Sequence, residues 1–332
     1  MNIITIDPEC KNKSLELVQS APPEPSEHEV LIEVAYAGVN RPDIAQRYGH
    51  YKPPPGASPH MGLEVSGRIV GLGSAVCDWQ IGDFVCALTN GGGYADYTVA
   101  PAKQCLPIPK GFSLLQAASL PETYFTVWSN VFMAGGFQRG DKVLVHGACS
   151  GIGVAAIQLI TELGGEVYTT AGSPSRCEFA EALGAVSAID RSRFDFAQEL
   201  ETHCPEGIDI TLDIVGGEYL NKHVKLAAPE GRIISIAGIG GFSAEVNLWS
   251  VMQKRLTITG STLRPRTELF KASVAQVLKK EVWPLFETQG LKAVIDSQYP
   301  LEQVEQAHQR MQSGEHIGKI MLVVNAELEG WC

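Results

Sequence analysis

Residues 141–163, DKVLVHGACSGIGVAAIQLITEL, have the pattern of a strand, a glycine-rich turn and a helix. The apolar run at the start is typical of a buried parallel strand, and the apolar spacing after the glycines is typical of a helix. Between them, Gly151, Gly153 and Ala156 match the GxGxxA pattern of a dinucleotide-binding turn. In that pattern the glycines permit a tight turn and close approach of a pyrophosphate to the helix N-terminus. The alternative is a tight turn that binds nothing, and the flanking strand and helix favour cofactor binding.

The composition excludes several classes of protein. The chain has 332 residues, 45% of them hydrophobic and 19% charged, with a net charge of −11. This length predicts two domains, and the acidic balance argues against nucleic acid or an anionic membrane as the main partner. The eight cysteines include no CxxC pair, which favours reduced thiols over a disulfide framework or a zinc knuckle. With no signal sequence and no apolar run of about 18 residues, we expect a cytoplasmic protein.

The pattern of strands and helices changes along the chain. Residues 1–110 contain short apolar and β-branched runs between Pro- and Gly-rich turns, which predicts a β-rich unit. Beyond Ser113, strands and helices alternate, and six strand candidates with helical crossovers predict a doubly wound parallel sheet. Two helices are expected, at residues 113–119 and 123–134, with Pro121 between them as a break. The fold class is therefore α/β, with a Rossmann sheet and a second, β-rich domain.

The C-terminal part is too short to form a domain of its own. After Pro265 the spacing predicts a helix at 267–283, a polar strand, a second helix and a final strand at 319–324. We expect this segment to rejoin the N-terminal unit, which makes that domain discontinuous. The predicted domains are residues 1–122 with 266–332, and residues 123–265.

The loop after the second Rossmann strand indicates which cofactor binds. NAD-binding folds usually carry an acidic residue about 20 residues beyond the glycine turn, where it accepts from the ribose 2′-OH. Here Ser173 and Arg176 occupy that loop instead. A carboxylate would repel a 2′-phosphate, whereas a hydroxyl and a guanidinium would hold one, so the sequence predicts NADP(H). Arg191, after the third strand, is placed to reach the same phosphate, and the alternative for both arginines is an ordinary solvated charge.

The ends of strands four and five are the expected wall of the nicotinamide site. They carry the motif DIVGG, which begins at Asp213, and the motif AGIGG, which begins at Ala237. In a doubly wound sheet the cofactor lies outside the carboxyl ends of the strands. For Asp213 a structural role, accepting from backbone amides, is favoured over catalysis.

Several motifs together resemble a known family, the zinc-free, zeta-crystallin-like quinone oxidoreductases of the medium-chain dehydrogenase/reductase superfamily. They are HGACSGIGVAAIQL, TAGSPSR, DIVGG, NRPDIAQRYGHYKPPPGAS, MGLEVSGRIVGLG, IGDFVCAL and HIGKIMLVV, and they cover nearly the whole chain. The resemblance implies a GroES-like catalytic domain, a Rossmann domain, a cleft between them and NADPH-dependent reduction of quinones. It also implies a homodimer, or a dimer of dimers, joined through residues 256–261.

The same resemblance assigns the site residues. It places Asn40 and Asp43 in the cleft motif and Tyr51 beside nicotinamide and substrate, and these three are the predicted catalytic residues. Many relatives have lysine where this chain has Arg176, and tyrosine where it has Arg191. Together with the motifs above, the predicted cofactor contacts are Thr126, Ser150, Gly151, Ile152, Gly153, Gly172, Ser173, Arg176, Arg191, Val215, Gly216, Gly238, Ile239, Gly240, Leu263 and Lys319.

No metal is expected. The zinc alcohol dehydrogenases of the superfamily supply a cysteine where this chain has Asn40 and a histidine where it has Leu63, beside Glu64. Catalytic zinc needs about three protein ligands, and the eight histidines show no paired metal spacing. His60 lies nearest to the lost ligand and is the histidine to check.

Without a metal, catalysis is expected to depend on holding the nicotinamide close to the acceptor and excluding water. Tyr51 and Asn40 are predicted to donate hydrogen bonds to the developing oxyanion, with the final proton from solvent. The alternative for Tyr51 is an aromatic wall residue. Two other functions stay open: reduction of an activated C=C bond in an enone or enoyl thioester, and a structural or regulatory NADPH-binding protein with little turnover.

Overall fold

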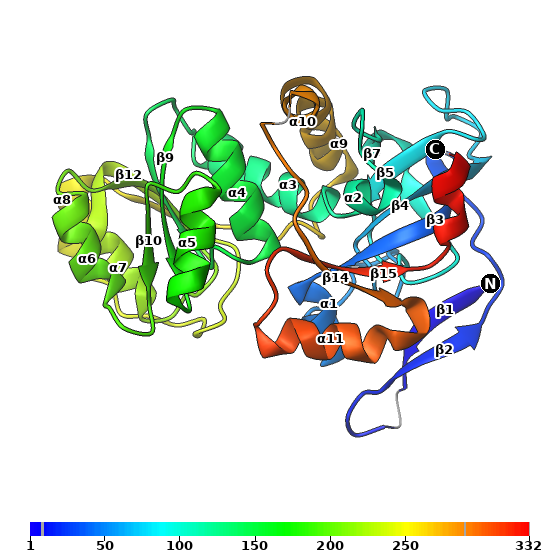
Figure 1. The fold of residues 1–332 in the computed structure, drawn as a ribbon, viewed down its shortest axis with the longest axis horizontal. Coiled ribbons are helices and arrows are strands. Elements are labelled where there is room, and N and C mark those ends of the chain that lie inside the picture. Colours follow the sequence, from blue (N-terminus) through cyan, green and yellow to red (C-terminus); the bar gives the residue numbers. More distant parts are fainter. Residues whose placement is uncertain (8–9, 289, 332) are drawn as a thin grey trace. The chain divides into compact units, whose positions relative to one another are not determined.

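The computed structural model describes residues 1–7, 10–288 and 290–331 (Figure 1). The chain divides into two compact units. Unit 1 comprises Met1–Phe125 and Arg264–Cys332, and unit 2 comprises Thr126–Leu263. The boundaries expected from the sequence fall within a few residues of these.

Unit 1 is built on a seven-stranded sheet with the order β14-β15-β3-β4-β5-β7, and β6 also pairs with β3. The C-terminal strand β15 runs antiparallel to β3, so the C-terminal segment joins the sheet formed by strands from the first 110 residues (Figure 1). The strands are β3 (Glu29–Val39), β4 (Glu64–Leu72), β5 (Phe84–Leu88), β6 (Tyr97–Pro101), β7 (Cys105–Pro107), β14 (Ile295–Pro300) and β15 (Lys319–Val323), beside a separate hairpin of β1 (Asn2–Ile6) and β2 (Leu15–Gln19).

The helices of unit 1 bury apolar stripes against this sheet. In α11 (Val304–Ser313), Val304, Ala307 and Met311 share one face and join the core that includes Ile32 of β3. Leu114 and Ala118 of α2 (Leu114–Ala118) instead join a second cluster with Ala35 and Met321. The other helices are α1 (Arg41–Arg47), α3 (Pro121–Val127), α9 (Glu268–Val277) and α10 (Trp283–Glu287), with 3-10 turns at Ala102–Gln104, Leu301–Gln303 and Ala326–Trp331.

Two helix predictions need correction. The two predicted helices are present, but the break between them lies at residues 119–120 and Pro121 is the first residue of α3, a position where the missing N–H costs no intrahelical bond. The chain continues from α3 into a π-helical stretch, Trp128–Ala134. The helix expected at 267–283 extends further, because a second π-helical stretch, Leu278–Val282, joins α9 to α10. Apolar spacing detects such helices but not their wider turns.

Unit 2 is a six-stranded sheet with the order β10-β9-β8-β11-β12-β13, in which every pairing is parallel. This confirms the predicted doubly wound fold. Its strands are β8 (Lys142–His146), β9 (Glu166–Ala171), β10 (Ser187–Asp190), β11 (Ile208–Asp213), β12 (Ala227–Ser235) and β13 (Thr257–Gly260), and its helices are α4 (Gly151–Glu162), α5 (Pro174–Ala182), α6 (Phe196–His203), α7 (Tyr219–Leu226) and α8 (Leu248–Lys254).

Helix α8 was not predicted. None of its residues is buried, and Leu248, Trp249 and Met252 are exposed, so its apolar residues do not mark a face turned toward a core. Within the described residues, no helix combines the length and the apolar character that crossing a membrane requires. The seven cysteines in the described part of the chain carry free thiols.

Candidate active site

The glycine turn of unit 2 is held by its own hydrogen bonds. Ser150 caps α4: its Oγ accepts from the backbone N–H of Gly153 at 3.0 Å and donates to the carbonyl of Gly147 at 2.8 Å. A Cβ on Gly153 would lie 2.3 Å from that carbonyl oxygen. Gly153 is therefore required by the packing of the turn itself. Gly151 and Ile152 follow Ser150 as the first residues of the helix.

The loop after β9 brings together the residues expected to hold a 2′-phosphate. Ser173 is the N-cap residue of α5, and its Oγ lies 3.2 Å from that of Ser175. The backbone N–H of Arg191, after β10, donates to Ala171 at 3.0 Å, and Arg191 Nη2 lies 3.6 Å from where a Cβ on Gly172 would be. Two neighbouring loops thus place a hydroxyl and a guanidinium around one short stretch of backbone. Arg176 is half-buried in the first turn of α5.

The loops after β11 and β12 pair with each other. The N–H of Gly240 donates to the carbonyl of Val215 at 2.7 Å, and Gly216 and Gly241 form an isolated parallel bridge. Asp213 is fully buried and accepts from the N–H groups of Val215 at 2.8 Å and Gly216 at 3.0 Å. This is the structural role favoured for Asp213.

The remaining cofactor candidates of unit 2 lie in different surroundings. Thr126 and Leu263 are buried, and the Thr126 carbonyl accepts from Ser129 Oγ at 3.2 Å and from Asn130 Nδ2 at 2.8 Å. Gly238 is packed closely by the ring of Phe242, whereas Ile239 is 62% exposed.

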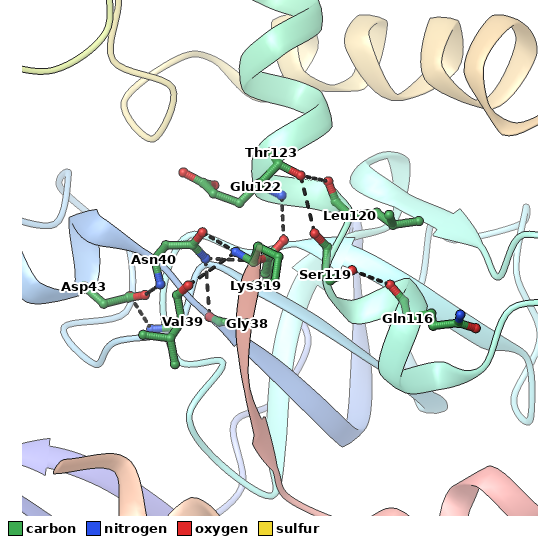
Figure 2. A network of polar contacts seen from close by, with 12 residues as sticks. Gly38, Val39, Asn40, Asp43, Gln116, Ser119, Leu120, Glu122, Thr123 and Lys319 are labelled. Atoms are coloured by element: carbon green, nitrogen blue, oxygen red, sulfur yellow. Dashed lines mark hydrogen bonds and ion pairs between the residues drawn. The ribbon is translucent and has the colours of Figure 1, made fainter. Parts of the chain in front are cut away.

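Unit 1 holds a buried polar cluster, which we define as Asn40, Asp43, Glu64, Glu122 and Lys319 (Figure 2). Glu64 begins β4 and is fully buried; it accepts from Asn40 Nδ2 at 2.9 Å and from the backbone N–H of Glu122 at 2.8 Å. Lys319 begins β15, and its Nζ lies 2.5 Å from both Glu64 Oε1 and Asn40 Oδ1. The cluster therefore contains a buried ion pair bridged by an amide.

The contacts of Asn40 bear on its predicted role. Its Nδ2 donates to Glu64 and to the carbonyl of Gly38 at 3.3 Å, which engages both N–H groups of the amide. The ammonium of Lys319 likewise has Glu64, Asn40 and the carbonyl of Val39 as acceptors. Neither side chain has an N–H left for a bound molecule in this arrangement, so donation by Asn40 and cofactor contact by Lys319 stay predictions that would need these bonds to rearrange.

Asp43 lies beneath Asn40 and positions it. Its carboxylate is fully buried and accepts from the N–H groups of Asn40 at 2.8 Å and Gly62 at 3.1 Å, and from Tyr94 Oη at 2.9 Å. Burial raises the pKa of Asp43 to about 6, against the opposing effect of these bonds. With its oxygens engaged, Asp43 is suited to fixing the α1 N-terminus.

Tyr51 lies beside Arg264. The Arg264 guanidinium lies 5.9 Å from the centroid of the Tyr51 ring, and it is itself held by Gln46 Oε1 at 2.6 Å and the carbonyl of Asn90 at 2.7 Å. Burial, followed by the charge of Glu122, raises the pKa of Tyr51 to about 12. The phenol is therefore protonated at neutral pH and able to donate a hydrogen bond.

Two charged groups of this region were missed by the sequence analysis. Burial, followed by the Glu64 carboxylate, raises the pKa of the half-buried Glu122 to about 8. Lys271 is buried in α9, donates to Asn90 Oδ1 at 2.5 Å and the Arg264 carbonyl at 2.8 Å, and burial lowers its pKa to about 8. Helical spacing could have predicted that Lys271 is buried, because it shares a helix face with Val274, Ala275 and Leu278, which are all buried.

The residues do not fit a zinc ion. Where the zinc enzymes have a thiolate and an imidazole, this chain has an engaged amide, Asn40, and a buried Leu63, and the adjacent Glu64 already pairs with Lys319. His60 is half-buried, and burial lowers its pKa. Across residues 1–7, 10–288 and 290–331, no three His, Cys, Asp or Glu side chains are grouped so as to hold a metal.

Two family models match the chain. One is described as the alcohol dehydrogenase GroES-like domain and covers residues 26–110; the other is described as zinc-binding dehydrogenase and covers residues 183–322. The second description names a metal for which the residues above do not supply ligands.

Curated relatives match most of the chain. A quinone oxidoreductase of Rattus norvegicus is 31% identical over 305 residues, which cover 91% of each protein. A synaptic vesicle membrane protein VAT-1 homolog of Danio rerio is also 31% identical, over 89% of this chain; the match spans only 64% of that relative's length. Among solved structures, the CurK enoyl reductase has a TM-score of 0.84 and 27% identity, and the match covers 97% of this chain and 98% of that one.

Proposed function

Because this chain belongs to the quinone oxidoreductase family of the medium-chain dehydrogenase/reductase superfamily, we propose that it is an NADPH-dependent quinone reductase that works without zinc. The observation that carries the proposal is the buried polar cluster of unit 1. Lys319 forms a buried ion pair with Glu64 and also contacts Asn40, the residue that stands where the zinc enzymes of the superfamily have a cysteine ligand. A quinone is electrophilic enough to accept a hydride without such a metal.

The cofactor in this proposal is NADP(H). Ser150 and the N-terminus of α4 would receive the pyrophosphate, and Ser173, Arg176 and Arg191 the 2′-phosphate. The described loop after β9 carries no carboxylate that would repel that phosphate. We therefore expect a preference for NADPH over NADH.

The chain's own residues would bind and orient the acceptor. When bound, NADPH supplies a hydride and thus both electrons. Tyr51, protonated at neutral pH, would donate a hydrogen bond to the acceptor oxygen on which negative charge develops. Because both N–H groups of Asn40 are engaged, Asn40 and Asp43 act in this proposal as positioning residues for the loop that leads into α1.

A second candidate is the reduction of an activated C=C bond in an enone or enoyl thioester. The likeness to an enoyl reductase at 27% identity favours it. The same residues serve both reactions, because each places negative charge on an oxygen conjugated to the reacting bond. The third alternative, a structural or regulatory NADPH-binding protein, predicts cofactor binding without turnover.

The experiment follows NADPH oxidation with small ortho- and para-quinones and an enone, with NADH as control cofactor, in the presence and absence of a chelator. The proposal expects chelator-insensitive quinone turnover that favours NADPH. Tyr51→Phe should lower kcat/KM by roughly tenfold and leave NADPH affinity unchanged, because one hydrogen bond to a charged group is lost. Turnover of the enone alone would favour the second candidate, and tight binding without turnover would favour the third.

The cytoplasmic location and a homodimer remain part of the proposal. All four residues of β13, at the edge of the unit 2 sheet, are exposed, among them Ile258. The neighbouring α8 exposes Leu248, Trp249 and Met252. An apolar edge of this kind favours pairing with a second copy. Sedimentation of Ile258→Lys should then show monomers where the unchanged protein shows dimers.

A further inference from the structure

Glu122 differs from the other acids of the polar cluster. Asp43 and Glu64 both accept several hydrogen bonds, and Glu64 also pairs with Lys319. Within the part of the chain that the structure describes, the Glu122 carboxylate has neither a hydrogen bond nor an ion pair. Its backbone, in contrast, is fixed, since its N–H donates to Glu64 Oε2 at 2.8 Å.

The direction of the side chain suits a functional role. Glu122 lies in the first turn of α3, and in Figure 2 its carboxyl group projects away from Leu120 and Thr123, on the side of the view where Asn40 is drawn. Glu64 accepts both from the Glu122 N–H and from Asn40 Nδ2, so Glu122 is anchored next to the predicted cleft motif. An anchored backbone with an unengaged carboxyl group at this position is suited to act on a ligand.

We propose that Glu122 is the catalytic proton donor of this enzyme, which delivers its carboxyl proton to the acceptor as the hydride arrives. This inference rests on the proposed function and deepens it, because the sequence analysis assigned the proton to solvent. A resident acid makes the site competent for acceptors that need a proton at carbon, and not for quinones alone.

The surroundings of Glu122 favour the protonated form. The negative charges of Glu64 and Asp43 oppose its ionisation, and those of Lys319 and Lys271 favour it. Lys319 is already paired with Glu64, and Lys271 is held by Asn90 and the Arg264 carbonyl. Among the described residues, Arg264 and Tyr51 are further titratable groups on which Glu122 acts electrostatically. Burial adds to the effect of Glu64, so the pKa of about 8 leaves most of Glu122 protonated at pH 7.

Comparison with Tyr51 identifies which group gives up the proton. The pKa of Tyr51 is about 12 and that of Glu122 about 8, so Glu122 is the stronger acid by roughly 10⁴-fold. Tyr51 is suited to donate a hydrogen bond that it keeps. Glu122 is suited to transfer its proton.

Bound NADPH would supply a hydride, and with it both electrons, to the quinone or to the β-carbon of an enone. The resulting hydroquinone anion or enolate takes the proton as the O–H bond of Glu122 breaks. The acceptor is reduced by two electrons, NADPH is oxidised to NADP⁺, and solvent then reprotonates the Glu122 carboxylate.

The two acceptors are expected to depend on Glu122 to different degrees. A hydroquinone anion is stable and can be protonated at oxygen by water after release. An enolate must be protonated at carbon to complete the reduction, which is a slower reaction. Loss of a general acid typically lowers a rate by 10²- to 10⁴-fold, so we expect a loss of about 10²-fold with the enone and about tenfold or less with the quinone.

The test compares Glu122→Gln, which keeps the shape but cannot donate this proton, with Glu302→Gln, a matched change at an exposed glutamate of the turn before α11. The kcat/KM of each is measured from pH 6 to 10 with a quinone and an enone, together with NADPH affinity by fluorescence. The unchanged enzyme and Glu302→Gln should lose activity above pH of about 8. Glu122→Gln should lose about 10²-fold in kcat/KM with the enone and about tenfold or less with the quinone, and its activity should not decline above pH of about 8. Its affinity for NADPH should stay within about twofold of that of the unchanged enzyme.

The outcomes separate the two proposals. If the unchanged enzyme turns over neither acceptor, the proposed function fails and this inference fails with it. If it turns over an acceptor and Glu122→Gln retains both the rate and the alkaline decline, only the role of Glu122 is overturned. A uniform loss that keeps the alkaline decline also overturns it, since that is the result of a structural role. If Glu122→Gln does not fold, the unchanged enzyme alone provides the test. The role of Glu122 as proton donor is rejected if kcat/KM of the unchanged enzyme does not decrease at alkaline pH.

Discussion

Each of the two units contains a polar cluster, and the two clusters differ in the charge of their side chains. In unit 2, His146 Nε2 lies 2.8 Å from His223 Nε2, and His146 Nδ1 lies 3.0 Å from Thr170 Oγ1. Burial lowers the pKa of both imidazoles, so this pair is neutral at pH 7. In unit 1, by contrast, Lys319 and Glu64 are paired charges, and Glu122 is a nearby acid without a partner within the described residues.

Burial therefore stabilises packing in unit 2, whereas in unit 1 it changes the acidity of a nearby side chain. A neutral imidazole pair avoids the cost of a buried charge, although within the described residues His223 Nδ1 has no hydrogen-bond partner and lies 3.8 Å from Asp213 Oδ2. The Asp213 carboxylate is occupied by backbone amides. A buried ion pair is stable only while both partners remain, and its field acts on every titratable group nearby. We therefore expect unit 1 to be the more sensitive of the two to single substitutions.

The largest effect should come from Lys319→Met. This change leaves the fully buried Glu64 carboxylate without its cation, and removal of one partner of a buried pair typically costs about 3 to 5 kcal/mol in the free energy of unfolding. Urea unfolding measures it, with Lys279→Met, at an exposed lysine, as control. Adding Glu64→Gln to Lys319→Met should recover part of the loss. A loss below about 1 kcal/mol for Lys319→Met would show that the pair is not buried as described.

The next effect should come from Asp43→Ala. It leaves three donors without an acceptor, namely the N–H groups of Asn40 and Gly62 and the hydroxyl of Tyr94, and we expect a loss of about 2 to 3 kcal/mol in the free energy of unfolding. Tyr94→Phe, which removes one of those donors, is the matched comparison and should cost about 1 kcal/mol. Equal losses in the two variants would contradict the central role of Asp43.

The same carboxyl group predicts a pH dependence of known sign. Burial raises the pKa of folded Asp43 to about 6 from an ordinary 3.8, so the folded state binds more protons than the unfolded state between these values. The stability from this group is fully present below pH 3.8 and is lost as pH rises through about 6. Asp43→Asn should remove this contribution from the stability profile of the unchanged protein.

The smallest effect is expected in unit 2 and has the opposite sign. The pKa of folded His223 is held below the ordinary 6.5 by burial, with Asp213 opposing this effect and Lys222 adding to it. The unfolded state therefore binds more protons as pH falls from 6.5, and stability is lost in that direction, by up to about 1.4 kcal/mol for each pH unit. His223→Gln should flatten this acid limb of the unfolding profile, whereas His28→Gln, at an exposed histidine, should leave it unchanged.

Local patterns in the sequence were sufficient for the framework of both units. The glycine turn, the alternation of strands and helices and the return of the C-terminal segment follow from apolar periodicity and turn residues, which act over a few residues. The same reasoning identified the loops that carry Ser150, Ser173 and Arg191. It failed where the local signal was absent or ambiguous: at Pro121, at the two π-helical stretches and at α8, whose apolar residues are exposed.

Local sequence patterns are therefore sufficient to predict the fold class and to locate a candidate cofactor loop. The state of each polar group in unit 1 depends instead on contacts between residues that are far apart in the sequence. Asn40 and Lys319 are 279 residues apart, yet their contact occupies both side chains. Glu122 acquires its raised pKa from burial and from Glu64, 58 residues before it. Such effects depend on which groups the fold brings together and on how far it excludes water from them. The local pattern of residues predicts neither.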